Sequence, residues 1–348
     1  MSKVVCKSCG KELPNRGFAC SCGYMEEMDD KTLWKIVSSY GKLHDVATVI
    51  TYTGIAAFLI GSLMAVFGNV VAGIVTVLIG TVLLFGGGIW KSNLHGLQSQ
   101  LLNDRLGAFF DAEHKRIVGP YTVFKKNEDY EKFRGVLKAT SVFKDGNEFE
   151  ARQLVEGTFK GMHYTTANVS INHCEKKEYR DNDGDLKTET DRTKLFDGIW
   201  IIVQQAKAVE NAVYVHERKV KRNGKYDVKA LPAGIELENT EWGEKYAVYS
   251  DSQHDAFYVL TPQLMEQLEA LDKAAGARTS VAFVGEHIHF ALDTERVFRG
   301  VEAAAAGNIN SIADMKNAFL DTLKYEAEIL DIIKCNSFIK LTQETEIR

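Results

Sequence analysis

Between Val46 and Trp90 the sequence contains no Asp, Glu, Lys, Arg or His. Proline is also scarce, with four residues in a chain of 348. Forty-five consecutive uncharged residues exclude a fully disordered chain, which needs charge to stay solvated, and a purely soluble protein. This stretch therefore has to lie in an apolar environment.

Common signatures of catalysis are missing as well. The sequence has no phosphate-binding loop of the form Gly-x4-Gly-Lys-Ser/Thr, no Gly-x-Ser-x-Gly elbow and no His-Glu-x-x-His motif. Its 42 basic and 47 acidic residues give a formal charge of −5, and a net acidic chain is a poor general binder of nucleic acid. No pattern identifies a reaction, and we expect no nucleic-acid partner.

Cysteine is concentrated at one end of the chain. Four of the six cysteines lie within the first 22 residues, whereas Cys174 and Cys335 are isolated. This distribution does not look like a disulfide framework. It fits a reducing compartment, where clustered cysteines more often bind a metal.

The clustered cysteines form two pairs, Cys-x-x-Cys-Gly and Cys-x-Cys-Gly. Glycine after each pair lets the chain turn tightly, and four thiolates satisfy a tetrahedral Zn²⁺. The pattern resembles the short zinc ribbon at the start of many bacterial membrane proteins, although Ala19 occupies the regular position of the third ligand. Residues 1–25 are therefore expected to bind a structural Zn²⁺; reduced thiols or a redox pair are the alternatives. The expected ligands are Cys6, Cys9, Cys20 and Cys22.

The uncharged stretch divides into two segments, residues 46–67 and 70–90. At 1.5 Å per residue each would extend roughly 32 Å as a helix, which matches the hydrocarbon core of a bilayer. Gly68-Asn69 between them is a turn dipeptide. We expect two transmembrane helices that form a tight hairpin in the lipid bilayer.

Glycines recur every seven residues in both segments, so that each set forms a stripe along one side of its helix. Stripes of small residues allow membrane helices to approach closely, and they predict the seam of the hairpin. An interface between copies of the chain is the alternative. The two sets are Gly54, Gly61 and Gly68, and Gly73, Gly80 and Gly87.

Basic residues near the ends of the hairpin predict its orientation. Lys31, Lys35 and Lys42 precede the first segment, Lys91 and Arg105 follow the second, and the turn carries no charge. Because basic residues favour the cytoplasmic side, both termini of this multi-pass protein are expected in the cytoplasm. The resemblance of the cysteine segment to bacterial membrane proteins implies that the membrane is the bacterial inner membrane.

The remaining chain is expected to be organised around this hairpin. Residues 26–45 would be a juxtamembrane linker and residues 91–120 a juxtamembrane helix, in which Leu94, Leu97 and Leu101 follow helical spacing. Residues 121–335 would form a mixed α+β cytosolic domain, and residues 336–348 a C-terminal tail. The predicted fold class is thus a membrane-anchored α+β protein with an N-terminal zinc ribbon.

Alternating and continuous apolar runs predict the strands of this domain. The predicted strands and hairpin are 162–173, 195–203, 213–228 (a hairpin around Asn223-Gly224), 246–249, 257–260, 280–284 and 287–292. Two helices carry end signals. One begins after Thr261 and ends at Gly276, and the other opens with the capping-box pattern Ser311-x-x-Asp314.

Several of these runs carry a family resemblance. Residues 196–203 (FDGIWIIV), 249–262, 280–283 and 288–292 look like a bacterial membrane-protein family catalogued as domain of unknown function 3137. The resemblance covers roughly residues 92–300. It implies an anchored cytosolic α+β domain with no established activity, and it supplies no catalytic residues.

Three weaker candidate sites remain. His287 and His289 lie on one face of a predicted strand and, with His254, could form a second metal site. A basic hairpin tip could contact anionic lipid headgroups or act as a charged edge that blocks strand addition. It consists of Arg218, Lys219, Lys221, Arg222 and Lys225. Residues 181–192 begin like a calcium loop, but Leu186 and Arg192 occupy positions that need Gly and Glu, so a solvated acidic loop is favoured.

Two functions follow from these patterns. The first is a membrane-anchored, non-catalytic scaffold or binding module that presents the cytosolic domain to a protein or lipid partner, or to a second copy of the chain. The alternative is a membrane-bound hydrolase or metalloenzyme that uses His254, His287 and His289.

Overall fold

The computed structural model describes residues 4–13, 20, 22, 28–68, 70–180, 186–222, 225–229, 234–294, 298 and 310–341, without the side chains of 177–180 and 186–188. The chain forms two compact units. The first unit comprises Met1–Ala112 and Ala304–Phe319, and the second Glu113–Ala303 and Leu320–Arg348. Each unit is described by itself below.

Two long helices dominate the first unit, α1 (Asp30–Phe67) and α2 (Val70–Ile117). Both are long and apolar enough to cross a membrane. Helix α1 begins where the Asp29 side chain accepts a hydrogen bond from the Thr32 N–H, 3.3 Å away. Residues 30–45, predicted as a linker, are therefore the first turns of α1, and the predicted juxtamembrane helix is a continuation of α2.

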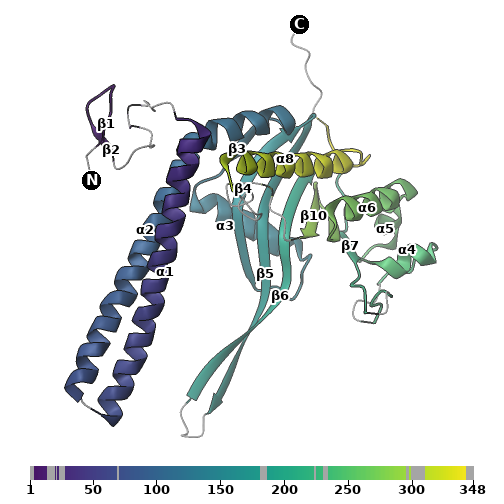
Figure 1. The fold of residues 1–348 in the computed structure, drawn as a ribbon. Coiled ribbons are helices and arrows are strands. Elements are labelled where there is room, and N and C mark those ends of the chain that lie inside the picture. Colours follow the sequence, from purple (N-terminus) through teal and green to yellow (C-terminus); the bar gives the residue numbers. More distant parts are fainter. Residues whose placement is uncertain are drawn as a thin grey trace. The chain divides into compact units, whose positions relative to one another are not determined.

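The two helices lie side by side along the predicted glycine stripes (Figure 1). A Cβ atom added to Gly54 would lie 2.5 Å from the Leu84 nitrogen, and one added to Gly80 would lie 2.5 Å from the Phe58 nitrogen. Gly61, Gly73 and Gly87 meet the facing helix in the same way. These five glycines confirm the predicted seam. Gly68 does not belong to it, because it caps α1 and faces only Met64 of its own helix.

The second unit is built on one antiparallel sheet of eight strands in the order β3-β4-β5-β6-β10-β9-β7-β8 (Figure 1). The strands are β3 (Tyr121–Val123), β4 (Glu148–Phe159), β5 (Met162–Arg180), β6 (Leu186–Gln204), β7 (Val213–Glu217), β8 (Tyr246–Ser250), β9 (Arg278–Val284) and β10 (His287–Asp293). Beyond Asn172 and Ile199 the long strands β5 and β6 pair only with each other and extend as a two-stranded ribbon (Figure 1).

Helices cover both faces of this sheet. On one face, called the α3 face below, Phe133 and Leu137 of α3 (Asn127–Thr140) belong to a buried cluster with Trp200. On the other face, Phe290 is surrounded by apolar side chains of α6 (Pro262–Ala275) and α8 (Ile312–Lys334). Because successive side chains of a strand point to opposite faces, the sheet contributes to two hydrophobic cores, one on each face.

The signals predicted for helix ends are confirmed. The Thr261 hydroxyl accepts from the Leu264 N–H at 3.2 Å, and Gly276 adopts φ +61° where α6 ends. The Ser311 hydroxyl accepts from the Asp314 N–H at 3.1 Å at the start of α8.

The predicted strands at 162–173, 195–203, 246–249, 280–284 and 287–292 are confirmed, although β5 and β6 are longer than predicted. The prediction for 257–260 was wrong, because this segment belongs to helix α5 (Gln253–Val259). The predicted 213–228 hairpin is reduced to a single bridge, Val220–Tyr226, since β7 pairs with β8 and β9 instead. Asn223, Gly224 and the tip of the acidic loop at 181–185 lie outside the described residues. In the second unit, no element was predicted at the positions of β3, β4, α3 and α4 (Thr240–Lys245).

Residues 336–341, part of the predicted C-terminal tail, contact the sheet of the second unit. Ile339 is buried, and it forms a bridge with Gln205, while Leu341 forms one with Met162. The described part of 336–348 therefore closes against the sheet of the second unit.

Candidate functional site

The N-terminal cysteines are positioned by a small hairpin. Strand β1 (Val4–Val5) pairs with β2 (Glu12–Leu13), and the chain between them turns tightly. The Cys6 N–H donates to the Lys11 carbonyl, and the Gly10 N–H donates to the Cys6 carbonyl, both at 2.9 Å. Gly10 adopts φ +72°, which explains the glycine after the first cysteine pair.

This turn brings the four thiol groups together. The Sγ atoms of Cys6 and Cys22 are 3.8 Å apart and those of Cys9 and Cys20 are 3.4 Å apart, and all four lie within 4.8 Å of one another. A tetrahedral site with metal–sulfur bonds of about 2.3 Å places its sulfurs about 3.8 Å apart. The four cysteines are therefore close enough to hold one metal ion.

The irregular second pair does not prevent this arrangement. Cys20 is separated from Cys22 by one residue instead of two, yet its thiol lies with the other three. Cys6 and Cys20 are buried, whereas Cys9 and Cys22 are exposed. Within the described ranges, this is the one group of three or more potential ligands with metal-binding spacing.

The predicted histidine pair lies on the α3 face of the sheet. The rings of His287 and His289 are 6.4 Å apart on β10. His289 is buried, and its Nδ1 accepts from the Trp200 indole N–H at 3.3 Å. Burial, with a smaller contribution from His287, lowers the pKa of His289 to about 3, so this ring is neutral at pH 7.

His254 does not join this pair. It lies at the exposed start of α5, where its Nδ1 is 3.5 Å from an Asp255 oxygen. Among the residues that the structure describes, His254, His287 and His289 form no group with metal-binding spacing. The second metal site predicted from the sequence is therefore not assembled in this arrangement.

The basic cluster separates into two kinds of residue. Arg218 is buried, and its guanidinium donates to the carbonyls of Gly243, Glu244 and Tyr246 at the end of α4. It is not available for lipid contact, so its assignment to the lipid-contact set is corrected. The remaining members are exposed: Lys219, Lys221, Arg222 and Lys225.

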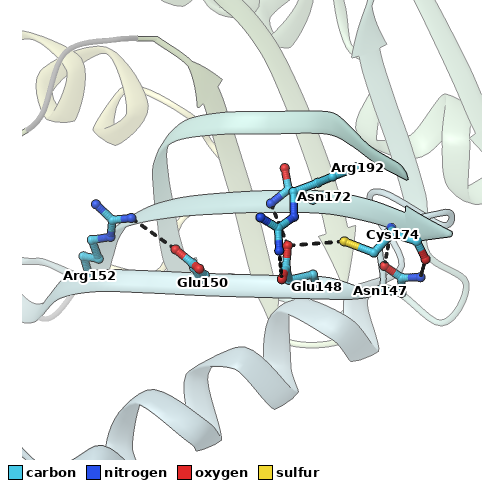
Figure 2. Close-up of polar contacts among 7 residues, drawn as sticks. All are labelled: Asn147, Glu148, Glu150, Arg152, Asn172, Cys174 and Arg192. Carbon is cyan, nitrogen blue, oxygen red and sulfur yellow. Dashed lines mark hydrogen bonds and ion pairs between the residues drawn. The ribbon is translucent and has the colours of Figure 1, made fainter. Parts of the chain in front are cut away.

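Cys174 takes part in a different contact, at the base of the β5–β6 ribbon (Figure 2). Its thiol donates to Glu148 Oε2 at 3.3 Å, and Arg192 donates to Glu148 Oε1 at 2.8 Å. Hydrogen bonding from Cys174, followed by that from Asn172, lowers the pKa of Glu148. The Asn147 side chain donates to the Cys174 carbonyl and accepts from the Cys174 N–H. These polar contacts join β4, β5 and β6, which fits a structural role.

Sequence patterns gave no sign of one further feature, a cavity of about 480 Å³ on the α3 face. Its lining includes Tyr214, His216, Tyr249 and Ser280 from three strands. No spacing pattern could have found it, because its residues come from segments far apart in the chain.

Comparison with curated proteins finds no match for this chain. Among solved structures, it is similar to the crystal structure of the mycobacterial trehalose monomycolate transport factor A, TtfA, with 11% sequence identity and a TM-score of 0.30. The similarity covers 65% of this chain and 95% of that one.

The family comparison matches a shorter segment than the predicted 92–300. It begins within β6 and ends at the last turn of α8. Residues 194–333 match the model of the family described as protein of unknown function (DUF3137), which confirms the family resemblance of this chain.

Proposed function

We propose that the protein is a membrane-anchored, non-catalytic binding or scaffold module of the bacterial inner membrane. In this proposal α1 and α2 cross the bilayer as a hairpin, the four cysteines bind one Zn²⁺, and the sheet domain is presented to a partner in the cytoplasm.

The main support for this proposal is the hairpin of α1 and α2, whose large apolar side chains point outward. Of the 30 large apolar side chains that are exposed among the described residues, 21 lie between Val46 and Trp90. The side chains of Leu59, Val66 and Val82 are 62%, 74% and 71% exposed, whereas glycines line the contact between the two helices. In water, this exposed apolar surface would cost a free energy of about 25 cal/mol per Å², whereas contact with lipid carries no such cost.

The charge distribution supports the proposed orientation. Lys31, Lys35 and Lys42 lie on α1 before its uncharged part, and Lys91 and Arg105 lie on α2 after it. A hairpin that leaves all of these on one side follows the preference of basic residues for the cytoplasm. A reducing cytoplasm would also keep the cysteine thiols free to bind metal.

Zinc is the metal that suits this cysteine set best. Four thiolates in a tetrahedron are typical of structural zinc, and they leave no open position for a reacting water. The hairpin of β1 and β2 has two residues in each strand, so bound metal would supply most of its folding free energy.

Anchoring is tested by washing membranes with alkaline carbonate, which removes peripheral proteins. The full-length protein should stay in the membrane pellet. Release into the supernatant would contradict the proposal.

Metal content is tested on the full-length protein purified in detergent. We expect about one zinc per chain by elemental analysis, and loss of most of it in Cys6→Ser/Cys9→Ser, because two of the four thiolates are removed. The matched control Cys174→Ser/Cys335→Ser should keep its zinc. A wild-type protein without zinc, or with disulfides between the clustered cysteines, would contradict this part of the proposal.

A further inference from the structure

The cavity on the α3 face has a defined architecture. Its floor consists of side chains from neighbouring strands: Tyr214 and His216 of β7, Tyr249 of β8 and Ser280 of β9. One wall is formed by Phe143, in the segment that follows α3. At about 480 Å³, the cavity lies in the size range of small-molecule sites, roughly 300–1,000 Å³.

Much of this lining is apolar. Phe143, Leu195 and Tyr214 are half-buried and pack against the buried core cluster. The ring of His216 lies 6.1 Å from that of Phe143 and 6.0 Å from that of Tyr249. Water against such a surface has few hydrogen-bond partners, so its displacement by an apolar group is favourable.

The imidazole and the serine hydroxyl on the floor are neutral and paired with each other. His216 Nδ1 and the Ser280 hydroxyl are 2.9 Å apart. Burial, with a smaller effect of Arg278, lowers the pKa of His216 to about 4, so the ring carries no charge at pH 7. A floor without charge does not compensate a buried ionic group, and the inner part of a ligand should therefore be apolar.

Charge is found at the rim instead. Lys144, Asp145 and Lys219 are exposed residues of the lining. Three other charged lining residues are compensated within the domain, because Asp227 pairs with Lys221, Arg278 pairs with Asp293, and Glu217 lies 3.8 Å from the Lys245 ammonium. The rim charge that faces a ligand is thus net positive.

From this arrangement we propose that the cavity binds an amphipathic anion, with its hydrocarbon part against Phe143, Leu195 and Tyr249 and its acidic group between Lys144 and Lys219. The assignment deepens the proposed binding role and rests on it, since it gives the sheet domain a ligand that is bound without being changed. A free fatty acid and an acidic phospholipid share this chemistry.

Photolabelling tests the proposal on the full-length protein in nanodiscs of phosphatidylcholine. One arm adds palmitate that carries a diazirine in its chain, and a second arm includes phosphatidylglycerol with the same diazirine. We expect mass spectrometry to map labels from at least one arm to peptides around residues 141–145, 195, 214 or 249. The labelled arm identifies the source of the ligand. Labels confined to the hairpin helices in both arms would overturn the proposal.

Matched variants test the role of charge. Lys144→Glu/Lys219→Glu should reduce cavity labelling by the anionic probe about tenfold, since two attractive charges become repulsive. Lys132→Glu on the exposed side of α3 should leave it unchanged. Equal labelling by a hexadecanol probe, or no effect of the double variant, would overturn the assignment of an anion.

A cavity-filling variant keeps the test independent of charge reversal. Leu195→Trp should reduce labelling by both probes, with folding of every variant checked by thermal unfolding. Undiminished labelling of the same peptides in a folded Leu195→Trp protein would show that the ligand does not occupy the cavity. Failure of these experiments would leave carbonate resistance and zinc content unaffected, so it can be told apart from failure of the proposed function.

Discussion

The buried guanidinium of Arg218 joins the end of α4 to the start of β8. It donates to the carbonyls of Gly243, Glu244 and Tyr246. The last carbonyls of a helix have no partner within their own helix, so the guanidinium serves as their donor. Arg218 and its exposed neighbour Lys219 are alike in charge and adjacent in sequence, yet their environments differ completely.

Arg218→Ala should therefore lower the free energy of unfolding by about 3 kcal/mol, because it removes the charged donor of three hydrogen bonds and empties a buried site. Lys219→Ala, the matched control, should change it by less than about 0.5 kcal/mol. Urea unfolding of the detergent-solubilised protein, followed by tryptophan fluorescence, measures both. Similar values for the two variants would show that the Arg218 contacts contribute little.

A second prediction concerns the buried, neutral ring of His289. Its pKa is about 3 in the folded protein and near 6.5 when unfolded. Below pH 6.5 the unfolded chain binds a proton that the folded protein does not, so stability is lost as the pH falls from 6.5 toward 3. His216, with a pKa of about 4, acts in the same direction.

His289→Gln keeps an acceptor for the Trp200 indole and removes the titration. Between pH 7 and pH 4.5 it should lose about 2–3 kcal/mol less stability than the wild type. His254→Gln, at an exposed position, should follow the wild-type curve. Urea titrations at the two pH values give the comparison, and parallel curves for all three proteins would refute the prediction.

Single residues were predictable where their chemistry acts locally. Thr261 and Gly276 end a helix through contacts within a few residues, and the clustered cysteines are near one another in the chain. Arg218 was not predictable in this sense. Its burial depends on carbonyls about 25 residues away, which no local pattern shows.

At the scale of elements, the glycine seam makes the sharpest prediction. A side chain at Gly80 would collide with the backbone of Phe58, whereas Gly86 on the same helix has open space around it. Gly80→Leu should destabilise the packed hairpin by about 1–3 kcal/mol through overpacking. Gly86→Leu should not.

Thermal unfolding of the two glycine variants in detergent, followed by the helical circular dichroism signal, distinguishes them. A lower unfolding temperature for Gly80→Leu alone supports the seam. Equal temperatures would mean that the helices do not rely on this contact.

Elements escaped prediction where their local signals were broken. Strand β4 contains a register shift between Arg152 and Val155, with Gln153 at φ +53°, and this bulge interrupts the alternation of apolar residues. Helix α3 begins after Lys126 with no side-chain cap. The apolar run of helix α5 is short and fits a strand as well as a helix, so only the Ser252 cap, which accepts from the Asp255 N–H, marks the helix.

At the scale of the whole molecule, the sequence predicted the parts better than their assembly. Hydropathy identified the two long helices, and periodicity identified most of the central strands. The strand order and the cavity on the α3 face depend on contacts between distant segments, such as His216 with Ser280. Such long-range pairing has no signal in a single sequence.

The central claim is that the hairpin crosses the membrane with both ends in the cytoplasm, and labelling of the turn tests it most directly. Asn69→Cys in intact cells should react with a maleimide that cannot cross the inner membrane. The wild-type protein, whose Cys335 is exposed, should react only after permeabilisation. Labelling of wild-type protein in intact cells, with an unreactive Asn69→Cys site, would contradict the account.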